Sequence, residues 1–266
     1  MEEDLGVSIF ERIPNGVRLS TAGELLIKHI RAQLSDIERI QTQIADLKGV
    51  RRGHIKIASG QAAMTELLPE LLTDYRHQYP AVTFEVMVCN RHDSEKLLAD
   101  YSADIAIVFE TVKHVHFHSL IDIPQQPHVV CSAAHELSGL DTVRLSQCLD
   151  FPLALPTPNN GLRLMLDRVV HKNGGILSPS IQSDNYDFLN RCLCDNNTLS
   201  FQLPIAMPSD RASLRDKGLC AIPIDRRDVP AGYLSVGQLR GRTLPVAAAR
   251  FIDTLANVLE TRFGSA

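Results

Sequence analysis

The sequence lacks a large excess of charge of either sign. Its 266 residues hold 27 Lys and Arg against 31 Asp and Glu, so the formal net charge is only −4. No global positive field draws the chain to nucleic acid, and any contact with DNA has to be local. The sequence also contains no run of about 18 apolar residues, so it predicts no membrane-spanning helix and no membrane partner.

Signals for export and for metal binding are missing as well. Three of the first four residues are acidic and no apolar segment follows them, so we expect a cytoplasmic protein with reduced thiols. The six cysteines form no C-x-x-C pair. His114, His116 and His118 alternate, but three successive ligands on one face of a strand do not easily converge on one ion. The sequence therefore predicts no metal and no cofactor.

The motifs of common enzyme classes are absent too. We find no Gly-rich phosphate loop, no G-x-S-x-G and no H-E-x-x-H. Asp and Glu are numerous but scattered, so no pair of carboxylates suggests acid–base catalysis. An enzyme on an α/β scaffold is thereby disfavoured, which leaves binding or regulation as the expected activity.

The first 20 residues predict a small β-hairpin. The segment Pro14–Gly16 contains Asn-Gly, whose residues accept the positive φ angles of a tight turn. The arms carry Arg12 and Arg18, which, with Asn15 at the tip, are candidates for contact with a DNA backbone. Thr21 and Glu24 then read as a capping box that starts a helix.

That helix, over residues 21–50, carries a narrow apolar stripe. Counting Gln33, its positions are separated by steps of 4 and 3, which is the heptad spacing of a coiled coil. The apolar members, which we call the seam, are Leu26, Ile30, Ile37, Ile40, Ile44 and Leu47. The pattern favours a dimerising helix, so a second copy of this chain is an expected partner. The alternative is a helix packed in the core of its own domain.

After Gly53 the pattern changes to short strands alternating with helices. Strands are expected at residues 54–59, 82–88 and 103–109, with helices at 64–79 and 93–100 between them. A second such series begins near Pro127 and a last helix covers 245–262. This order predicts an α/β fold with a mostly parallel sheet.

The N-terminal residues resemble the LysR-type transcription regulators. Residues 2–12 read EEDLGVSIFER, 16–19 read GVRL and 20–24 read STAGE, which match the end of the recognition helix, the wing and the start of the linker helix in that family. Further on, DIAIV at 104–108 and PTPNNGLRLML at 156–166 resemble later family segments in the same order. The resemblance covers the whole chain. The family normally has some thirty to forty residues before this point, which hold most of the helix-turn-helix.

What the resemblance implies is a two-lobed sensor like the type 2 periplasmic binding proteins. Residues 1–20 would be the remnant of the DNA-binding domain, 21–50 the linker helix and 54–266 the effector-binding domain. The chain would cross between lobes near 123–127 and 228–232. Lobe I would then comprise about 54–125 and 230–266, and lobe II about 126–229.

An effector is expected between the lobes, where the strands end and the next helices begin. Small and polar residues in such turns can aim N–H groups at a small polar or anionic molecule. Glu110 adds an unusual charge there, and Gln202 is a polar residue in an apolar strand. The candidate effector-binding residues are Ser59, Gly60, Gln61, Ala62, Phe109, Glu110, Thr157, Asn159, Asn185 and Gln202.

The sequence thus predicts an effector-responsive transcription regulator, with DNA as a partner in the intact family member. A free-standing small-molecule binding protein is the alternative. It is less favoured because such a protein has no use for a wing and a coiled-coil helix. A chain without the recognition helix is not expected to read a DNA sequence.

Overall fold

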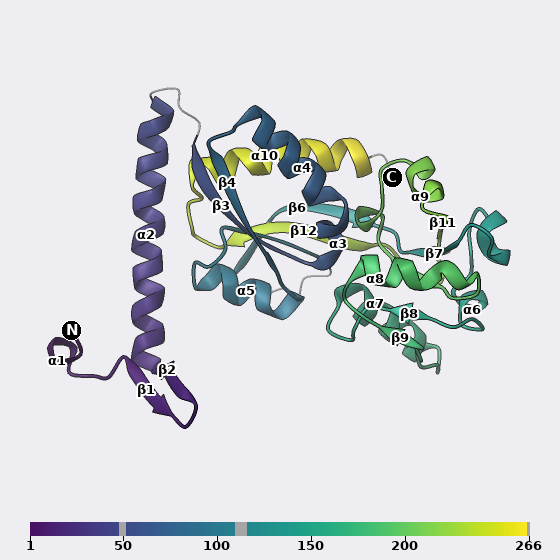
Figure 1. The fold of residues 1–266 in the computed structure, drawn as a ribbon, viewed down its shortest axis with the longest axis horizontal. Coiled ribbons are helices and arrows are strands. Elements are labelled where there is room, and N and C mark those ends of the chain that lie inside the picture. Colours follow the sequence, from purple (N-terminus) through teal and green to yellow (C-terminus); the bar gives the residue numbers. More distant parts are fainter. Residues whose placement is uncertain (48–51, 110–115, 265–266) are drawn as a thin grey trace.

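The computed structural model describes residues 1–47, 52–109 and 116–264. Figure 1 shows a small N-terminal hairpin, one long helix beside it, and two further bodies joined by extended segments. The predicted strand–helix alternation is confirmed, and the molecule has the two-lobed α/β architecture that the sequence indicates.

The N-terminal part consists of α1 (Glu2–Leu5), the hairpin of β1 (Phe10–Ile13) and β2 (Gly16–Leu19), and α2 (Thr21–Leu47). The residue that caps α2 is one position earlier than expected. Ser20 Oγ, not Thr21, accepts the N–H of Gly23 and also donates to the carbonyl of Ser8. A Cβ on Gly23 would lie 2.2 Å from the carbonyl oxygen of Ile9, so only glycine lets the hairpin approach α2 this closely.

Lobe I is a five-stranded mixed sheet in the order β4-β3-β5-β12-β6. The strands β3, β4 and β5 are parallel, whereas β12 runs antiparallel to β5 and β6. Their bounds are β3 Gly53–Ser59, β4 Val82–Val88, β5 Ile105–Phe109, β6 Phe117–Gln125 and β12 Gly232–Leu239. The expected parallel order therefore holds for the pairings of β3 with β4 and β5. β6 was not among the expected strands, although its residues alternate between more and less exposed along its whole length.

Helices cover both faces of this sheet. On one face, α4 and α10 bury Leu71, Tyr75 and Phe251 against β3 and β5. On the other face, α5 packs Leu98 against small residues such as Ala58 and Ala106. The helix expected at 64–79 is interrupted at Glu66. The helices of this lobe are α3 Gln61–Thr65, α4 Leu67–Gln78, α5 Arg91–Ala99 and α10 Val246–Phe263.

Lobe II is built on a three-stranded antiparallel sheet with β7 in the centre and β10 and β11 at its edges. A second, parallel pair joins β8 to β9. The strands are β7 His128–Ser132, β8 Ala154–Leu155, β9 Ile181–Gln182, β10 Ser200–Gln202 and β11 Leu219–Pro223. The α-helices are α6 Leu145–Cys148, α7 Gly161–Lys172, α8 Tyr186–Arg191 and α9 Arg211–Asp216, and 3₁₀ turns cover Glu136–Gly139, Cys192–Asp195 and Pro204–Ala206.

Two segments connect the lobes. The first lies between the end of β6 at Gln125 and the start of β7 at His128, and the second between Pro223 and Gly232. Gln126 bridges them, because its Nε2 donates to the carbonyls of Ile224 at 2.8 Å and Val229 at 2.9 Å. The two connecting segments are thus bonded to each other through Gln126.

Candidate functional site

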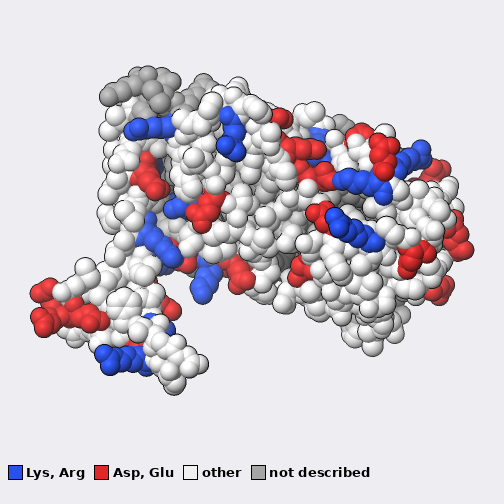
Figure 2. Space-filling view, in the orientation of Figure 1, with Lys and Arg blue, Asp and Glu red and all other residues white. Residues whose placement is uncertain are grey.

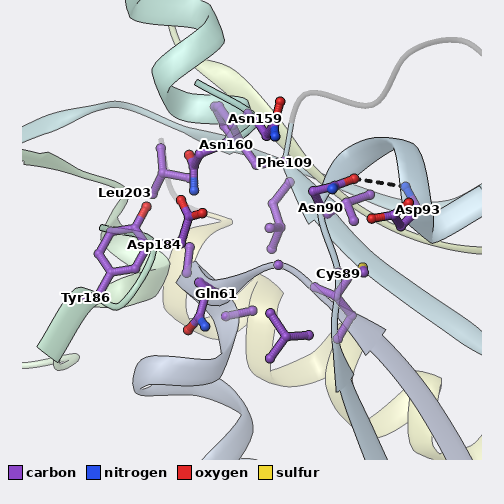
Figure 3. A pocket seen from close by; sticks show the side chains of 18 residues that line it. Gln61, Cys89, Asn90, Asp93, Phe109, Asn159, Asn160, Asp184, Tyr186 and Leu203 are labelled. Atoms are coloured by element: carbon purple, nitrogen blue, oxygen red, sulfur yellow. Dashed lines mark hydrogen bonds between the residues drawn. The ribbon is translucent and has the colours of Figure 1, made fainter. Parts of the chain in front are cut away.

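A cavity of about 290 Å³ lies between the two lobes (Figure 3). Lobe I contributes the ends of β3, β4 and β5, and lobe II contributes the start of α7 and the segment before α8. This is the edge at which open α/β sheets bind ligands. The polar and glycine residues of the lining are Gly60, Gln61, Asn90, Asp93, Asn159, Asn160, Gly161, Asp184 and Tyr186.

The turn after β3 places three of its four candidate residues on the cavity. Gly60, Gln61 and Ala62 line it. Ser59 does not, because it is fully buried and its hydroxyl donates to the carbonyl of Gly60. The N–H of Gly60 donates to Ile107 O in the sheet at 2.9 Å, so it is already used. The side chain of Gln61 is therefore the adaptable polar group of this turn.

Phe109, at the end of β5, lines the cavity and lies close to Gly161 of lobe II. A Cβ on Gly161 of lobe II would lie 2.5 Å from the carbonyl oxygen of Phe109 in lobe I. Glycine at 161 is therefore required for this arrangement of the lobes. Glu110, the next candidate residue, lies outside the described residues.

The turn after β4 is a part of the site that the sequence analysis missed. Asn90 caps α5, and its Oδ1 accepts the N–H groups of His92 and Asp93, both at 2.9 Å (Figure 3). Asn90 and Asp93 line the cavity. The signal was an asparagine directly after a strand and before a helix, which is a preferred N-cap. Because Asn90 satisfies these N–H groups, they are not available to a ligand.

On the lobe II side, Asn159 lines the cavity, and Thr157 holds the lining residue Asp184. The N–H and the hydroxyl of Thr157 donate to Asp184 at 3.0 and 2.7 Å. Thr157 itself is half-buried and does not line the cavity, whereas Asp184 does. Asn160 caps α7 as Asn90 caps α5. Thr157 thus orients the carboxylate that faces the cavity.

The two remaining candidates, Asn185 and Gln202, do not line the cavity. Asn185 caps α8 by accepting from Phe188 N and is not among the lining residues. Gln202 is buried, its Nε2 donates to Asn190 Oδ1, and its Oε1 has no partner among the described residues. Tyr186 was missed, although it lines the cavity. Burial raises the pKa of its hydroxyl, so the phenol stays a neutral hydrogen-bond donor.

The charge of the cavity is carried by carboxylates. Asp93 and Asp184 line it, and no Lys, Arg or His is present among its described lining residues. With both helix N-termini capped by their own asparagines, the lining offers amides, a phenol and carboxylates. Such a set suits a polar ligand with hydrogen-bond donors better than an anion.

The seam of α2 faces away from the sensor. The described side chains of Ile30, Ile37, Ile40 and Ile44 are 44–51% exposed. Half a turn away on the helix, Ser35 bonds to Arg242 of the sensor and Thr42 is buried beside α10. Leu26 is half-buried, and the side chain of Leu47 lies outside the described part.

The hairpin leaves its basic side chains in solvent. Arg12 and Asn15 are exposed, and Arg18 is exposed but paired with Glu11 at 2.8 Å across the two strands. Figure 2 shows Lys and Arg interspersed with Asp and Glu on this face of the molecule. Among the described residues no helix is long and apolar enough to span a membrane, and no three His, Cys, Asp or Glu form a metal-binding group. His114 lies outside those residues.

Known proteins are similar to this chain in sequence and in fold. The family description "LysR substrate binding domain" matches residues 48–260. The HTH-type transcriptional regulator YtlI of Bacillus subtilis is 26% identical over 181 residues, which are 66% of this chain and 56% of YtlI. The chain spans about half the length of several such curated relatives.

Solved structures agree with the fold. The Synechocystis CcmR regulatory domain in complex with 2-PG has a TM-score of 0.64 and 19% identity, covering 79% of this chain and 98% of that domain. Full-length CbnR complexed with target DNA has a TM-score of 0.61 and 15% identity, covering 97% of this chain and 86% of CbnR. With the family match extending over most of the sequence, this chain belongs to the LysR family of transcription regulators.

Proposed function

We propose that this chain is the effector-sensing and dimerising part of a bacterial transcription regulator that acts in the cytoplasm. The observation that carries the proposal is the interlobe cavity, which is lined by polar side chains of both lobes. A ligand that contacts both lobes favours the arrangement in which they are close, and it can shift the protein toward that state. The curated relatives are transcription regulators, which favours binding over catalysis.

The effector we propose is a small polar molecule that donates hydrogen bonds. The cavity volume lies at the lower end of the range for small-molecule sites. Asp184 is oriented by Thr157, and Gln61 lines the cavity from lobe I (Figure 3). A cationic or neutral donor group between these two side chains would satisfy both, whereas a carboxylate ligand would meet Asp184 as a like charge.

We propose that effector binding controls DNA binding through a dimer of this chain. The exposed seam of α2 supports self-association, because four isoleucines on one face of a helix otherwise remain in water. DNA as a partner rests on the family and on the wing, where Arg12 and Asn15 are accessible.

The test is a thermal-shift screen of the chain with sets of metabolites grouped as amines, neutral polyols and amides, and carboxylates. A ligand of the folded state raises the melting temperature by mass action. We expect a shift with the first two groups. Asp184→Asn should weaken the affinity roughly 10- to 150-fold and so reduce the shift, as expected for a charged hydrogen bond worth about 1.5–3 kcal/mol. Asp187→Asn removes an exposed charge nearby that does not line the cavity, so it serves as the matched control.

The proposal fails if ligands that stabilise the protein do so equally in wild type and in Asp184→Asn. It also fails if Asp187→Asn weakens binding as much as Asp184→Asn does, because the effect would then come from overall charge and not from the cavity.

A further inference from the structure

Two of the six cysteines face each other inside lobe II. Cys131 of β7 and Cys220 of β11 are directly opposite in the antiparallel register, and their Sγ atoms are 3.3 Å apart. Opposite residues of an antiparallel pair have Cα atoms about 4.5–5.5 Å apart, and a disulfide requires about 4.4–6.8 Å. The backbone therefore already has the spacing of a disulfide. Both cysteines are free thiols in this structure.

One of the two thiols can be reached from outside. Cys131 is fully buried, whereas Cys220 is partly exposed and lines a second cavity of about 440 Å³. This cavity, bounded by Met207, Arg215 and other residues of lobe II and by the end of α10, shares no lining residue with the interlobe cavity. A small molecule can therefore meet Cys220 first and Cys131 only through it.

The surroundings favour Cys220 as the nucleophile and Cys131 as the thiol that reacts with it afterwards. The hydrogen bond from the Cys131 thiol lowers the pKa of Cys220, and the positive charge of Arg215 lowers it further. The same hydrogen bond and burial raise the pKa of Cys131. By contrast, burial raises the pKa of Cys89 and of Cys148 to about 12, so these two thiols stay protonated.

We propose that Cys131 and Cys220 form a redox-active dithiol site, which a small peroxide entering the second cavity converts to a disulfide. The Cys220 thiolate attacks one peroxide oxygen and the O–O bond breaks. Cys220 becomes a sulfenic acid and the other oxygen leaves, taking up a proton as water. Cys131 then attacks the sulfur of Cys220, the S–O bond breaks, and the second oxygen leaves as water with the proton of Cys131. Two thiols are oxidised and one peroxide is reduced to two waters.

The site lies on the two strands that run to the segments joining the lobes. β7 follows directly on the first connecting segment, and β11 leads into the second. A disulfide would fasten these strands to each other three residues from their His128–Pro223 ends, where the connecting segments begin. Because β11 is an edge strand, it can move the short distance that bond formation requires.

The experiment uses the reduced full chain and hydrogen peroxide. We expect peptide mapping to show a Cys131–Cys220 crosslink with a mass loss of two hydrogens, formed before other cysteines react. The oxidised protein should melt at a higher temperature, and dithiothreitol should reverse the change, because the bond closes a loop between residues 89 positions apart. This measurement needs no variant and cannot fail through misfolding.

Variants then separate the roles of the two sulfurs. With Cys131→Ser, a 1,3-diketone probe should capture a lasting sulfenic acid on Cys220, and Arg215→Gln should slow crosslinking a few-fold. Cys194→Ser, at an exposed position outside the pair, is the control and should leave the rate unchanged. The proposal is overturned if peroxide oxidises Cys194 while the pair stays reduced, or if the crosslink forms only after the protein is unfolded.

Discussion

Arg242 is one of the side chains through which the sensor holds the long helix, together with Asp100, which pairs with Arg31 of α2 at 3.1 Å. The Nη2 atom of Arg242 lies 2.6 Å from Asp104 Oδ1 and 2.7 Å from Ser35 Oγ on α2, and its Nη1 donates to the carbonyl of Ala103. The guanidinium also stacks on Tyr101, 4.7 Å from the ring centroid. Both charged side chains are only 5–6% exposed. Replacing Arg242 by Met would keep much of its volume and remove all of these bonds.

The expected loss is large because one charge stays buried. Within the described part of the chain, Asp104 would keep only the backbone N–H of Lys56 as a hydrogen-bond partner. Removing one member of a buried ion pair costs about 3–5 kcal/mol. For a chain of this size each kcal/mol lowers the melting temperature by about 2–4 °C, so Arg242→Met should melt about 6–20 °C lower. Ser35→Ala removes one hydrogen bond without stranding a charge and should cost about 0.5–1.5 kcal/mol.

Urea unfolding of four proteins measures these effects: wild type, Arg242→Met, Ser35→Ala and the double variant. Arg227→Met is the control, because Arg227 forms an equally close pair with Asp225 but is exposed, and its loss should change stability little. A shift of less than 1 kcal/mol for Arg242→Met would refute the reasoning that this pair is shielded from water. If the single and double Arg242 variants are equally stable, Ser35 acts only through Arg242.

Four other outcomes are expected. Gly161→Ala should separate the lobes, because the new Cβ would lie 2.5 Å from Phe109 O; a wild-type radius in X-ray scattering would contradict this. The double variant Ile37→Lys, Ile44→Lys should be monomeric in light scattering, and a monomeric wild type at micromolar concentration would disprove dimerisation through the seam. Hydrogen bonds from Thr198 and Arg144 lower the pKa of Asp195 and Asp228, respectively, below the value of about 4 in the unfolded chain. Both carboxylates therefore stabilise the fold above that pH, and the free energy of unfolding should fall as the pH drops below it. In Arg144→Met this fall should be smaller. A polypeptide of these 266 residues should bind random and promoter duplexes equally and weakly in a salt titration, since residues 1–53 hold equal numbers of acidic and basic residues.

The fold was largely predictable because its signals are local. Strand and helix periods, the Asn-Gly turn and the heptad steps each depend on a few neighbouring residues, and most elements begin or end within a few residues of the expected positions. The exceptions are non-local. Ser20 caps α2 instead of Thr21 because the carbonyl of Ser8 lies within reach of its hydroxyl. β6 becomes a strand because β12, more than a hundred residues later, pairs with it.

The site was harder to predict, because a turn residue can face a ligand or its own protein. Thr157 and Asn185 occupy positions suited to ligand contact, but Asp184 and the N-terminus of α8 take their hydrogen bonds. Asn90 and Asp184 each carry only the local signal of a turn before a helix, and that they line one cavity follows from the two lobes coming together, since more than ninety residues separate them. The absence of a cation among the described lining residues is likewise a property of the folded cavity and not of any one turn.

The geometry of α2 bears on how sensing could reach a dimer. Its seam and its contacts with the sensor lie on opposite faces of the helix, so a partner helix and the sensor do not compete for the same side chains. Arg242 follows β12, which is also the strand that receives the second connecting segment between the lobes. We therefore expect a change in the lobes that shifts β12 to reach α2 through the Arg242–Ser35 bond, beside which the Arg31–Asp100 pair is a second contact. A variant that lacks the Arg242–Ser35 bond should therefore still bind the ligand and still dimerise, but ligand binding should no longer alter the dimer.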